Sequence, residues 1–218
     1  MDLRLKQKVS LVCAASEGLG KASALELVKE GSKVAICSRD KEKLISTRKE
    51  IADQTGSQVE IFEADLTNLE QINQLQKEVK SKLGAIQILV NNVGGPPPGT
   101  FEKLTDEDWK EAINLTMMSA LRMSQTVIPD MKKANWGRII NISSVSVKTP
   151  VNSLFLSNSI RLGVLGWAKA LSDEVGQHGI TVNTVCPGST RTNRITSIYC
   201  STAKQTGQSI EEIEKLSS

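Results

Sequence analysis

Residues 9–21 read VSLVCAASEGLGK, a short apolar run followed by a turn of small residues. The apolar half is typical of a buried strand, and the residues from Gly18 onward have helical spacing. Such a turn lets the backbone approach a pyrophosphate, because the helix that follows points unpaired N–H groups and the positive end of its dipole at the ligand. A glycine turn after a strand also occurs for packing reasons alone, so this stretch by itself leaves both interpretations open.

The rest of the chain repeats this alternation of short apolar runs and longer helical stretches. The pattern predicts βαβ units and an α/β fold with a doubly wound (Rossmann) parallel sheet, which binds its ligand at the carboxyl ends of the strands. We expect six strands, at residues 9–13, 33–37, 59–62, 87–91, 138–142 and 180–185. The expected helices are residues 18–30, 41–55, 69–83, 106–131 and 151–176. Thr105 with Asp108 is a helix-start signal.

Length and composition favour a single soluble domain over residues 1–218. The chain is 39% hydrophobic and 23% charged, and no linker or low-complexity segment divides it. Its net charge of +3 is too small to indicate a nucleic-acid or membrane partner. The four cysteines lie far apart and no signal peptide or membrane-length apolar run is present, so we expect a cytoplasmic protein without a metal site.

Six short motifs occur in order along nearly the whole chain. They are a glycine turn at 13–20, Asp65 with Leu66, Asn-Asn-Val-Gly at 91–94, Asn114, the strand GRIINISS at 137–144, and Pro187 with Gly188. In this order they resemble the short-chain dehydrogenase/reductase family, including its 3-oxoacyl reductases, whose glycine turn reads T-G-x-x-x-G-x-G. The resemblance implies an oxidoreductase that moves a hydride between a nicotinamide dinucleotide and a carbonyl or alcohol substrate.

The end of the second expected strand indicates which dinucleotide binds. Enzymes of this fold that use NAD place an acidic residue there to accept from the ribose 2′-hydroxyl. Here Ser38 takes that place, and Arg39 can hold a 2′-phosphate with charge-assisted hydrogen bonds, so NADP(H) is favoured over NAD(H). The alternative is that Arg39 is a solvated charge that pairs with Asp40. From the turn, this position and the resemblance together, the expected cofactor-binding residues are Ala14, Ser16, Glu17, Gly18, Leu19, Gly20, Ser38, Arg39, Asp65, Leu66, Asn92, Gly94, Arg161, Pro187, Gly188 and Thr190.

The resemblance also implies a catalytic set of Ser, Tyr, Lys and Asn. Ser144 matches the Ser and Asn114 the Asn, but Ser157 and Arg161 stand where the family has Tyr-x-x-x-Lys. An aliphatic hydroxyl is a much weaker acid than a phenol, whose pKa is about 10. Arg161 can donate to ribose hydroxyls but stays charged and cannot pass a proton onward. The expected catalytic residues are therefore Ser144, Ser157, Arg161 and Asn114.

Three interpretations of this departure remain open from the sequence. In the first, Ser144 and Ser157 polarise the carbonyl and water delivers the proton. In the second, the protein binds NADP(H) without turnover, as a sensor or scaffold. In the third, Ser157 and Arg161 are helix-surface residues and the proton donor lies elsewhere. The only tyrosine, Tyr199, belongs to the segment that resembles the family's mobile substrate loop.

Two segments are candidates for the substrate end. The loop at residues 94–100, rich in Gly and Pro, is either one wall of the substrate pocket or a rigid surface connection. Residues 188–218 resemble the family's substrate lid, with a weak amphipathic stretch at 210–213. There Thr190 and Thr192 are candidates for cofactor contact. Arg191 and Arg194 are either attractors of an anionic substrate or solvated charges.

Family members normally continue with a further helix and a seventh strand, whereas this chain stops at Ser218. Strand 180–185 would then have an exposed edge, which implies either truncation or an edge used for assembly. The helices at 106–131 and 151–176 resemble those that pair across the family's other two-fold axis. A homodimer or homotetramer is therefore expected, with a small-molecule carbonyl or alcohol as substrate.

Overall fold

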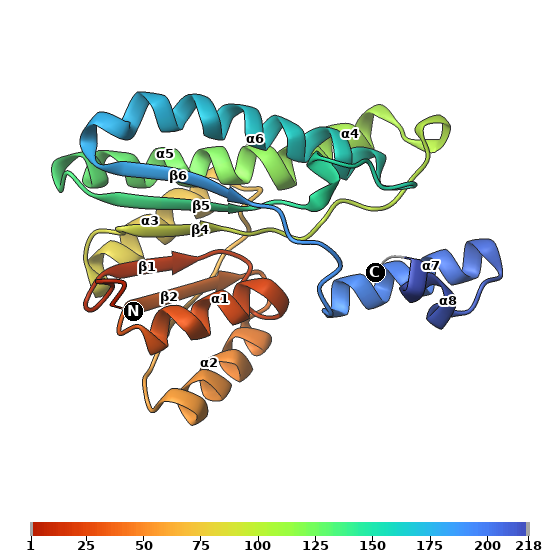
Figure 1. Ribbon diagram of the computed structural model, residues 1–218. Helices are drawn as coiled ribbons and strands as arrows, with labels where there is room; N and C mark the ends of the chain where they lie inside the picture. The colour runs from red at the N-terminus through yellow and green to blue at the C-terminus, as the bar shows by residue number, and fades with distance from the viewer. Residues whose placement is uncertain (1, 217–218) are drawn as a thin grey trace.

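The computed structural model describes residues 2–216, apart from the side chains at positions 201, 204, 205 and 216. Its strands form one parallel sheet in the order β3-β2-β1-β4-β5-β6 (Figure 1). The strands are β1 (Val9–Val12), β2 (Lys33–Ser38), β3 (Glu60–Glu63), β4 (Ile88–Asn91), β5 (Gly137–Ile142) and β6 (Ile180–Val185). The order reverses between β1 and β4, which is where doubly wound sheets bind their ligands. The predicted fold and its six strands are confirmed.

Helices cover both faces of the sheet and also extend past its carboxyl end (Figure 1). Apolar residues of α1 and α2 pack on one face, and those of α3, α5 and α6 pack on the other. The α-helices are α1 (Gly18–Lys29), α2 (Lys41–Thr55), α3 (Leu69–Leu83), α4 (Asp106–Ala112), α5 (Ser119–Lys133), α6 (Phe155–Val175), α7 (Asn193–Thr206) and α8 (Ile210–Leu216). Short 3-10 turns lie at Phe101–Lys103, Val145–Val147 and Gly176–His178.

The helix expected at 106–131 is confirmed as a continuous helical stretch, but the structure divides this stretch into three parts. α4 is followed by a π-helical segment, η2 (Ile113–Met118), and then by α5. A π-helical turn has i→i+5 hydrogen bonds in place of i→i+4, is rare, and is frequent at functional sites, so helical spacing in the sequence does not predict it. The start signal is confirmed: Thr105 Oγ1 accepts from the Asp108 N–H at 3.3 Å, and Asp108 Oδ2 accepts from the Thr105 N–H at 2.8 Å.

The expected start of the next helix at Val151 is four residues too early, since α6 begins at Phe155. Asn158 explains the difference by binding the backbone of Val151 on both sides. Its Oδ1 accepts from the Val151 N–H at 3.2 Å, and its Nδ2 donates to the Val151 carbonyl at 2.9 Å. These bonds hold residues 151–154 as a turn before the helix.

The segment after β6 is more regular than its sequence suggested. It holds α7 and α8, which project beyond the carboxyl ends of the strands (Figure 1). Thr192 begins α7 by accepting from the Ile195 N–H at 3.3 Å. β6 is one of the two edge strands of the sheet, as expected. No helix within residues 2–216 is long and apolar enough to cross a membrane.

Candidate active site

A cavity of about 1120 Å³ lies at the carboxyl ends of the strands. Its lining comes from the residues that follow all six strands and, on the opposite side, from α7 and α8. Every expected cofactor-binding residue except Gly20 lines it, and so do Ser144, Ser157 and Arg161. The fold therefore brings together residues that are spread from position 14 to position 190.

The loop between β1 and α1 has the geometry of a pyrophosphate cradle. Glu17 precedes α1 but its side chain forms no capping hydrogen bond, which leaves the first amides of the helix available to a ligand. Gly18 has a φ of +58°, in the left-handed region that favours glycine. A Cβ at Gly20 would lie 2.5 Å from the Ala14 carbonyl oxygen, so Gly20 permits the tight packing of helix on loop and is itself buried.

Ala14 is a strained position in the same loop. Its φ is +44°, a conformation that L-residues with a side chain rarely adopt. The family motif T-G-x-x-x-G-x-G has glycine at this place. Asn92 Nδ2 donates to the Ala14 carbonyl at 3.1 Å and holds the loop in this conformation. The loop geometry is thus retained at some cost in backbone energy.

The turn after β2 leaves Arg39 facing the cavity. Ser38 Oγ accepts from the Asp40 N–H at 3.2 Å, and the Asp40 carboxylate accepts from the Lys43 N–H at 3.0 Å at the start of α2. Within the described part of the chain, Arg39 forms no ion pair with Asp40 or any other carboxylate. The alternative of an Arg39–Asp40 pair is therefore not what the structure shows.

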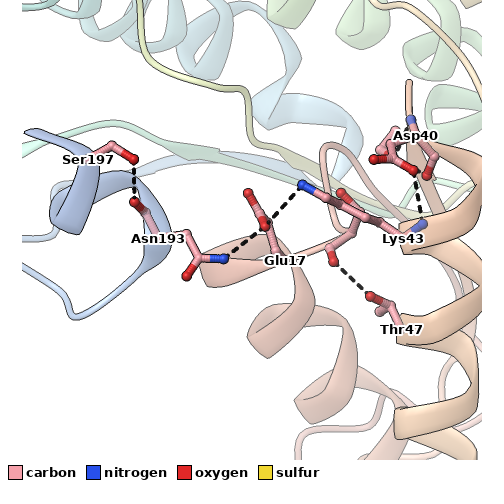
Figure 2. Close-up of polar contacts among 8 residues, drawn as sticks. Glu17, Asp40, Lys43, Thr47, Asn193 and Ser197 are labelled. Atoms are coloured by element: carbon pink, nitrogen blue, oxygen red, sulfur yellow. Dashed lines mark hydrogen bonds and ion pairs between the residues drawn. The ribbon is translucent and has the colours of Figure 1, made fainter.

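Glu17 connects three elements around the cavity (Figure 2). Its Oε2 accepts from Asn193 Nδ2 of α7 at 3.1 Å and lies 3.5 Å from Lys43 Nζ of α2. Thr47 Oγ1, also on α2, donates to the Ser16 carbonyl at 2.8 Å. The contacts of Asn193 and Lys43 with Glu17 could not be predicted from the sequence, because no local pattern signals a contact between residues so far apart in the chain.

Ser157 and Arg161 lie one helical turn apart on α6, and each is only 9% exposed. Arg161 Nε donates to Ser157 Oγ at 3.1 Å, and its Nη1 donates to the Ile142 carbonyl at 3.2 Å. Burial, and secondarily the charge of Arg194, lowers the pKa of Arg161 to about 10, so it is still protonated at neutral pH. The interpretation of Ser157 and Arg161 as helix-surface residues is wrong.

Ser144 follows β5 at the edge of the same cavity. Its Oγ accepts a hydrogen bond from the Ser146 N–H at 3.1 Å. An accepting hydroxyl still has its own proton to donate. Ser144 and Ser157 are thus both placed as hydrogen-bond donors toward the cavity, because Ser157 Oγ likewise accepts, from Arg161.

Asn114 differs from the other expected catalytic residues, because it does not line the cavity. It lies in η2, where its Nδ2 donates to the Thr67 carbonyl at 3.2 Å and its Oδ1 accepts from Arg122 Nη1 at 2.8 Å. These bonds tie the π-helical segment to the loop after β3. The side chain of Asn114 therefore positions η2 rather than facing a substrate.

The cavity lining contains residues of both segments that the sequence offered as candidates for the substrate end. Gly95 and Pro98 of the loop at 94–100 line it, and so does Tyr199 of α7, which is 8% exposed. The two arginines of this segment differ in their contacts. Arg191 is a solvated charge, with a side chain 89% exposed and 2.9 Å from Glu214. Arg194 is also exposed to solvent, but it lines the cavity and donates to the Pro96 carbonyl.

Comparison with known proteins gives consistent results. The family model of short chain dehydrogenases matches residues 8–200. A 3-oxoacyl-[acyl-carrier-protein] reductase of Aquifex aeolicus is 32% identical over 205 residues, which cover 94% of this chain and 82% of that protein. A putative ketoacyl reductase of Streptomyces coelicolor is 34% identical over 193 residues, covering 88% of this chain and 74% of the relative.

Solved structures are equally similar. A variant of actinorhodin polyketide ketoreductase with NADPH superposes with a TM-score of 0.90 at 32% identity, over 98% of this chain and 82% of the other. The L-sorbose reductase of Gluconobacter frateurii, complexed with NADPH and L-sorbose, has a TM-score of 0.90 at 26% identity, over 98% and 81% of the two chains.

Proposed function

Because this chain belongs to the short-chain dehydrogenase/reductase family, we propose that it is an NADP(H)-dependent oxidoreductase that reduces a carbonyl group or oxidises the corresponding alcohol. The observation that carries the proposal is the buried hydrogen bond from Arg161 to Ser157, inside the cavity and beside Ser144. It keeps a cation and a hydroxyl at the two positions where the family has Lys and Tyr.

The residues present fit NADP(H). The uncapped amides at the start of α1, next to Gly18, suit its diphosphate, and Arg39 suits its 2′-phosphate. Arg161 has further N–H donors for the nicotinamide ribose. Two structural neighbours were solved with NADPH, which supports the same cofactor here. When bound, the nicotinamide supplies or accepts the hydride.

The chain's own contribution is electrostatic. Ser144 and Ser157 each accept one hydrogen bond and are free to donate their own proton to a carbonyl oxygen. The positive charge of Arg161 on Ser157 Oγ makes that hydroxyl a stronger donor. Fixed donors of this kind stabilise the negative charge that develops on the oxygen as hydride arrives, and each is worth about 100-fold in rate. A water molecule then delivers the proton, since a serine hydroxyl is too weak an acid to do so.

A second candidate function is NADP(H) binding without turnover. The absence of a phenol at position 157 favours it, because the proton donor of the family is missing from the cavity wall. Tyr199 does not take the place of the family's catalytic tyrosine. Tyr199 belongs to α7, and no lysine neighbours it in the cavity lining that the structure describes.

NADPH consumption against a panel of ketones, oxo esters and diones tests the two candidates. We expect slow turnover with at least one carbonyl, reduced about 100-fold in Ser157→Ala with unchanged NADPH affinity. The double variant Ser157→Tyr, Arg161→Lys should turn over faster than the wild type. NADPH binding without turnover of any carbonyl by the wild-type protein would favour the second candidate instead.

The proposal also includes features of the whole molecule. We propose that residues 188–218, with α7 and α8, form the lid of a single domain, and that the protein is a cytoplasmic homodimer or homotetramer. Exposed apolar side chains at Phe101, Phe155 and Leu162 support an interface around α4 and α6. Light scattering of the purified protein would measure the oligomeric state.

A further inference from the structure

The charged residues of the cavity are unevenly distributed. Beside β2 and β3, the cations Arg39 and Lys43 alternate with carboxylates. Beside β4 and β5, the charged residues of the lining are Arg161 and Arg194, whereas the lining carboxylates follow β1, β2 and β3. The carboxylates of the described lining belong to Glu17, Asp40 and Asp65.

These carboxylates are already engaged elsewhere. The Glu17 carboxylate binds Asn193 and Lys43, and that of Asp40 accepts from the first turn of α2. Asp65 Oδ1 accepts from the N–H and the hydroxyl of Thr67 at 2.9 and 2.8 Å. Across the described residues, no carboxylate comes within ion-pair distance of Arg161 or Arg194.

Arg194 is held firmly against the loop that follows β4. Its Nη2 donates to the Pro96 carbonyl at 2.6 Å. The guanidinium covers Gly95, where an added Cβ would lie 2.9 Å from Nη2 and 3.2 Å from Nε. This placement uses a single donor for the protein, so the remaining N–H groups are available to a ligand.

Arg161 faces the same region from α6. It is more than nine-tenths buried, and its described hydrogen bonds are to Ser157 and to the Ile142 carbonyl. The charge of Arg194 adds to burial in lowering the pKa of Arg161, which means that the two guanidinium groups repel each other. A buried cation that faces a second cation without a counter-ion is unfavourable, and an anion bound between Arg161 and Arg194 would relieve this.

We propose that Arg194, together with Arg161, forms an anion-binding subsite at the substrate end of the cavity, and that the substrate is a carbonyl compound carrying a carboxylate or phosphate group. The statement about the substrate rests on the proposed function. The statement about the subsite does not, because the two arginines stand in the cavity whichever reaction takes place there. Guanidinium groups bind both anions through paired hydrogen bonds.

Calorimetric titration with oxamate and with inorganic phosphate tests the subsite, on the free protein and on the protein saturated with NADPH. We expect at least one of the two anions to bind to wild type and to bind about tenfold or more weakly to Arg194→Gln. Ethyl oxamate, the neutral ester, should bind equally poorly to both. The matched control is Arg191→Gln, which removes the exposed neighbouring arginine and should leave anion binding unchanged. Whichever of oxamate and phosphate binds identifies the chemistry of the anion.

Three results would overturn the subsite: neither anion binds, Arg194→Gln leaves both unchanged, or Arg194→Gln weakens NADPH by the same factor as the anion. The last result would mean that Arg194 serves the phosphates of the cofactor. Wild-type protein that binds anions but not NADPH would refute the proposed function while the subsite stands.

Discussion

Asn193 Nδ2 donates to the Glu17 carboxylate at 3.1 Å, and the two residues lie 176 positions apart in the chain. The bond joins the start of α7 to the loop that precedes α1 (Figure 2). The start of α7 and the loop before α1 are therefore linked directly. A change at either side is expected to be felt at the other.

Removal of this bond should loosen α7. In Asn193→Ala we expect faster amide hydrogen exchange in α7 and a several-fold higher rate of NADPH release, because a solvent-exposed hydrogen bond to a carboxylate contributes about 1 kcal/mol. Hydrogen exchange with mass spectrometry and stopped-flow fluorescence would measure the two effects. The control is Ser197→Ala, since Ser197 bonds only within α7, to the Asn193 carbonyl. Equal exchange in Asn193→Ala and wild type would contradict the link.

Arg39 should decide the preference for NADPH over NADH. Its replacement by alanine removes charge-assisted hydrogen bonds to the 2′-phosphate, so we expect NADPH affinity to fall about 10- to 100-fold, with NADH affinity nearly unchanged. Fluorescence titration of both dinucleotides would show this. Arg48→Ala on α2 is the control, because Arg48 does not line the cavity. A parallel loss for both dinucleotides would mean that Arg39 does not read the 2′-phosphate.

Ala14→Gly should stabilise the protein. Ala14 has a φ of +44°, where a side chain is unfavourable, so glycine should raise the free energy of unfolding by about 0.5–1 kcal/mol after its own entropy cost. Urea denaturation would measure the change. Ala15→Gly is the matched control: Ala15 is fully buried without a positive φ, and its replacement should lower stability. A less stable Ala14→Gly protein would show that the loop is not strained.

The pH dependence of the rate should reflect the Ser157–Arg161 pair. Burial lowers the pKa of Arg161 to about 10, so Arg161 stays protonated from pH 6 to 9 and the reduction rate should be flat there. The rate should then fall as pH rises through about 10, because deprotonation removes the positive charge that makes Ser157 a stronger hydrogen-bond donor. In the double variant Ser157→Tyr, Arg161→Lys a phenol that titrates replaces the serine. The reduction rate of this variant should therefore fall at a lower pH than the rate of the wild type. Steady-state kcat/KM across this range would distinguish the two profiles. A titration between pH 6 and 9 in the wild type would point to a different proton donor.

Features encoded locally in the sequence were predictable. The strand, the glycine turn and the helix at residues 9–29 follow from neighbouring residues, and the four-residue spacing of Ser157 and Arg161 placed both on one helix face. Their burial could not be predicted, because it depends on β5 and the loops that pack against α6. The same holds for Asn114, whose side chain is taken by Thr67 and Arg122.

Contacts between distant segments were beyond the sequence. Arg191 and Arg194 are equivalent charges in a polar stretch, yet one pairs with Glu214 at the surface and the other covers Gly95. Their different contacts follow only from the position of α7 over the cavity, which the sequence does not indicate. The helix itself was missed because few apolar residues in that stretch recur with helical spacing.

The affinity of the purified wild-type protein for NADPH and NADH tests the central claim most directly. Titration calorimetry should show saturable binding of NADPH, about tenfold or more tighter than that of NADH. A folded protein that binds neither dinucleotide would contradict the assignment of the cavity, and with it the proposed reaction.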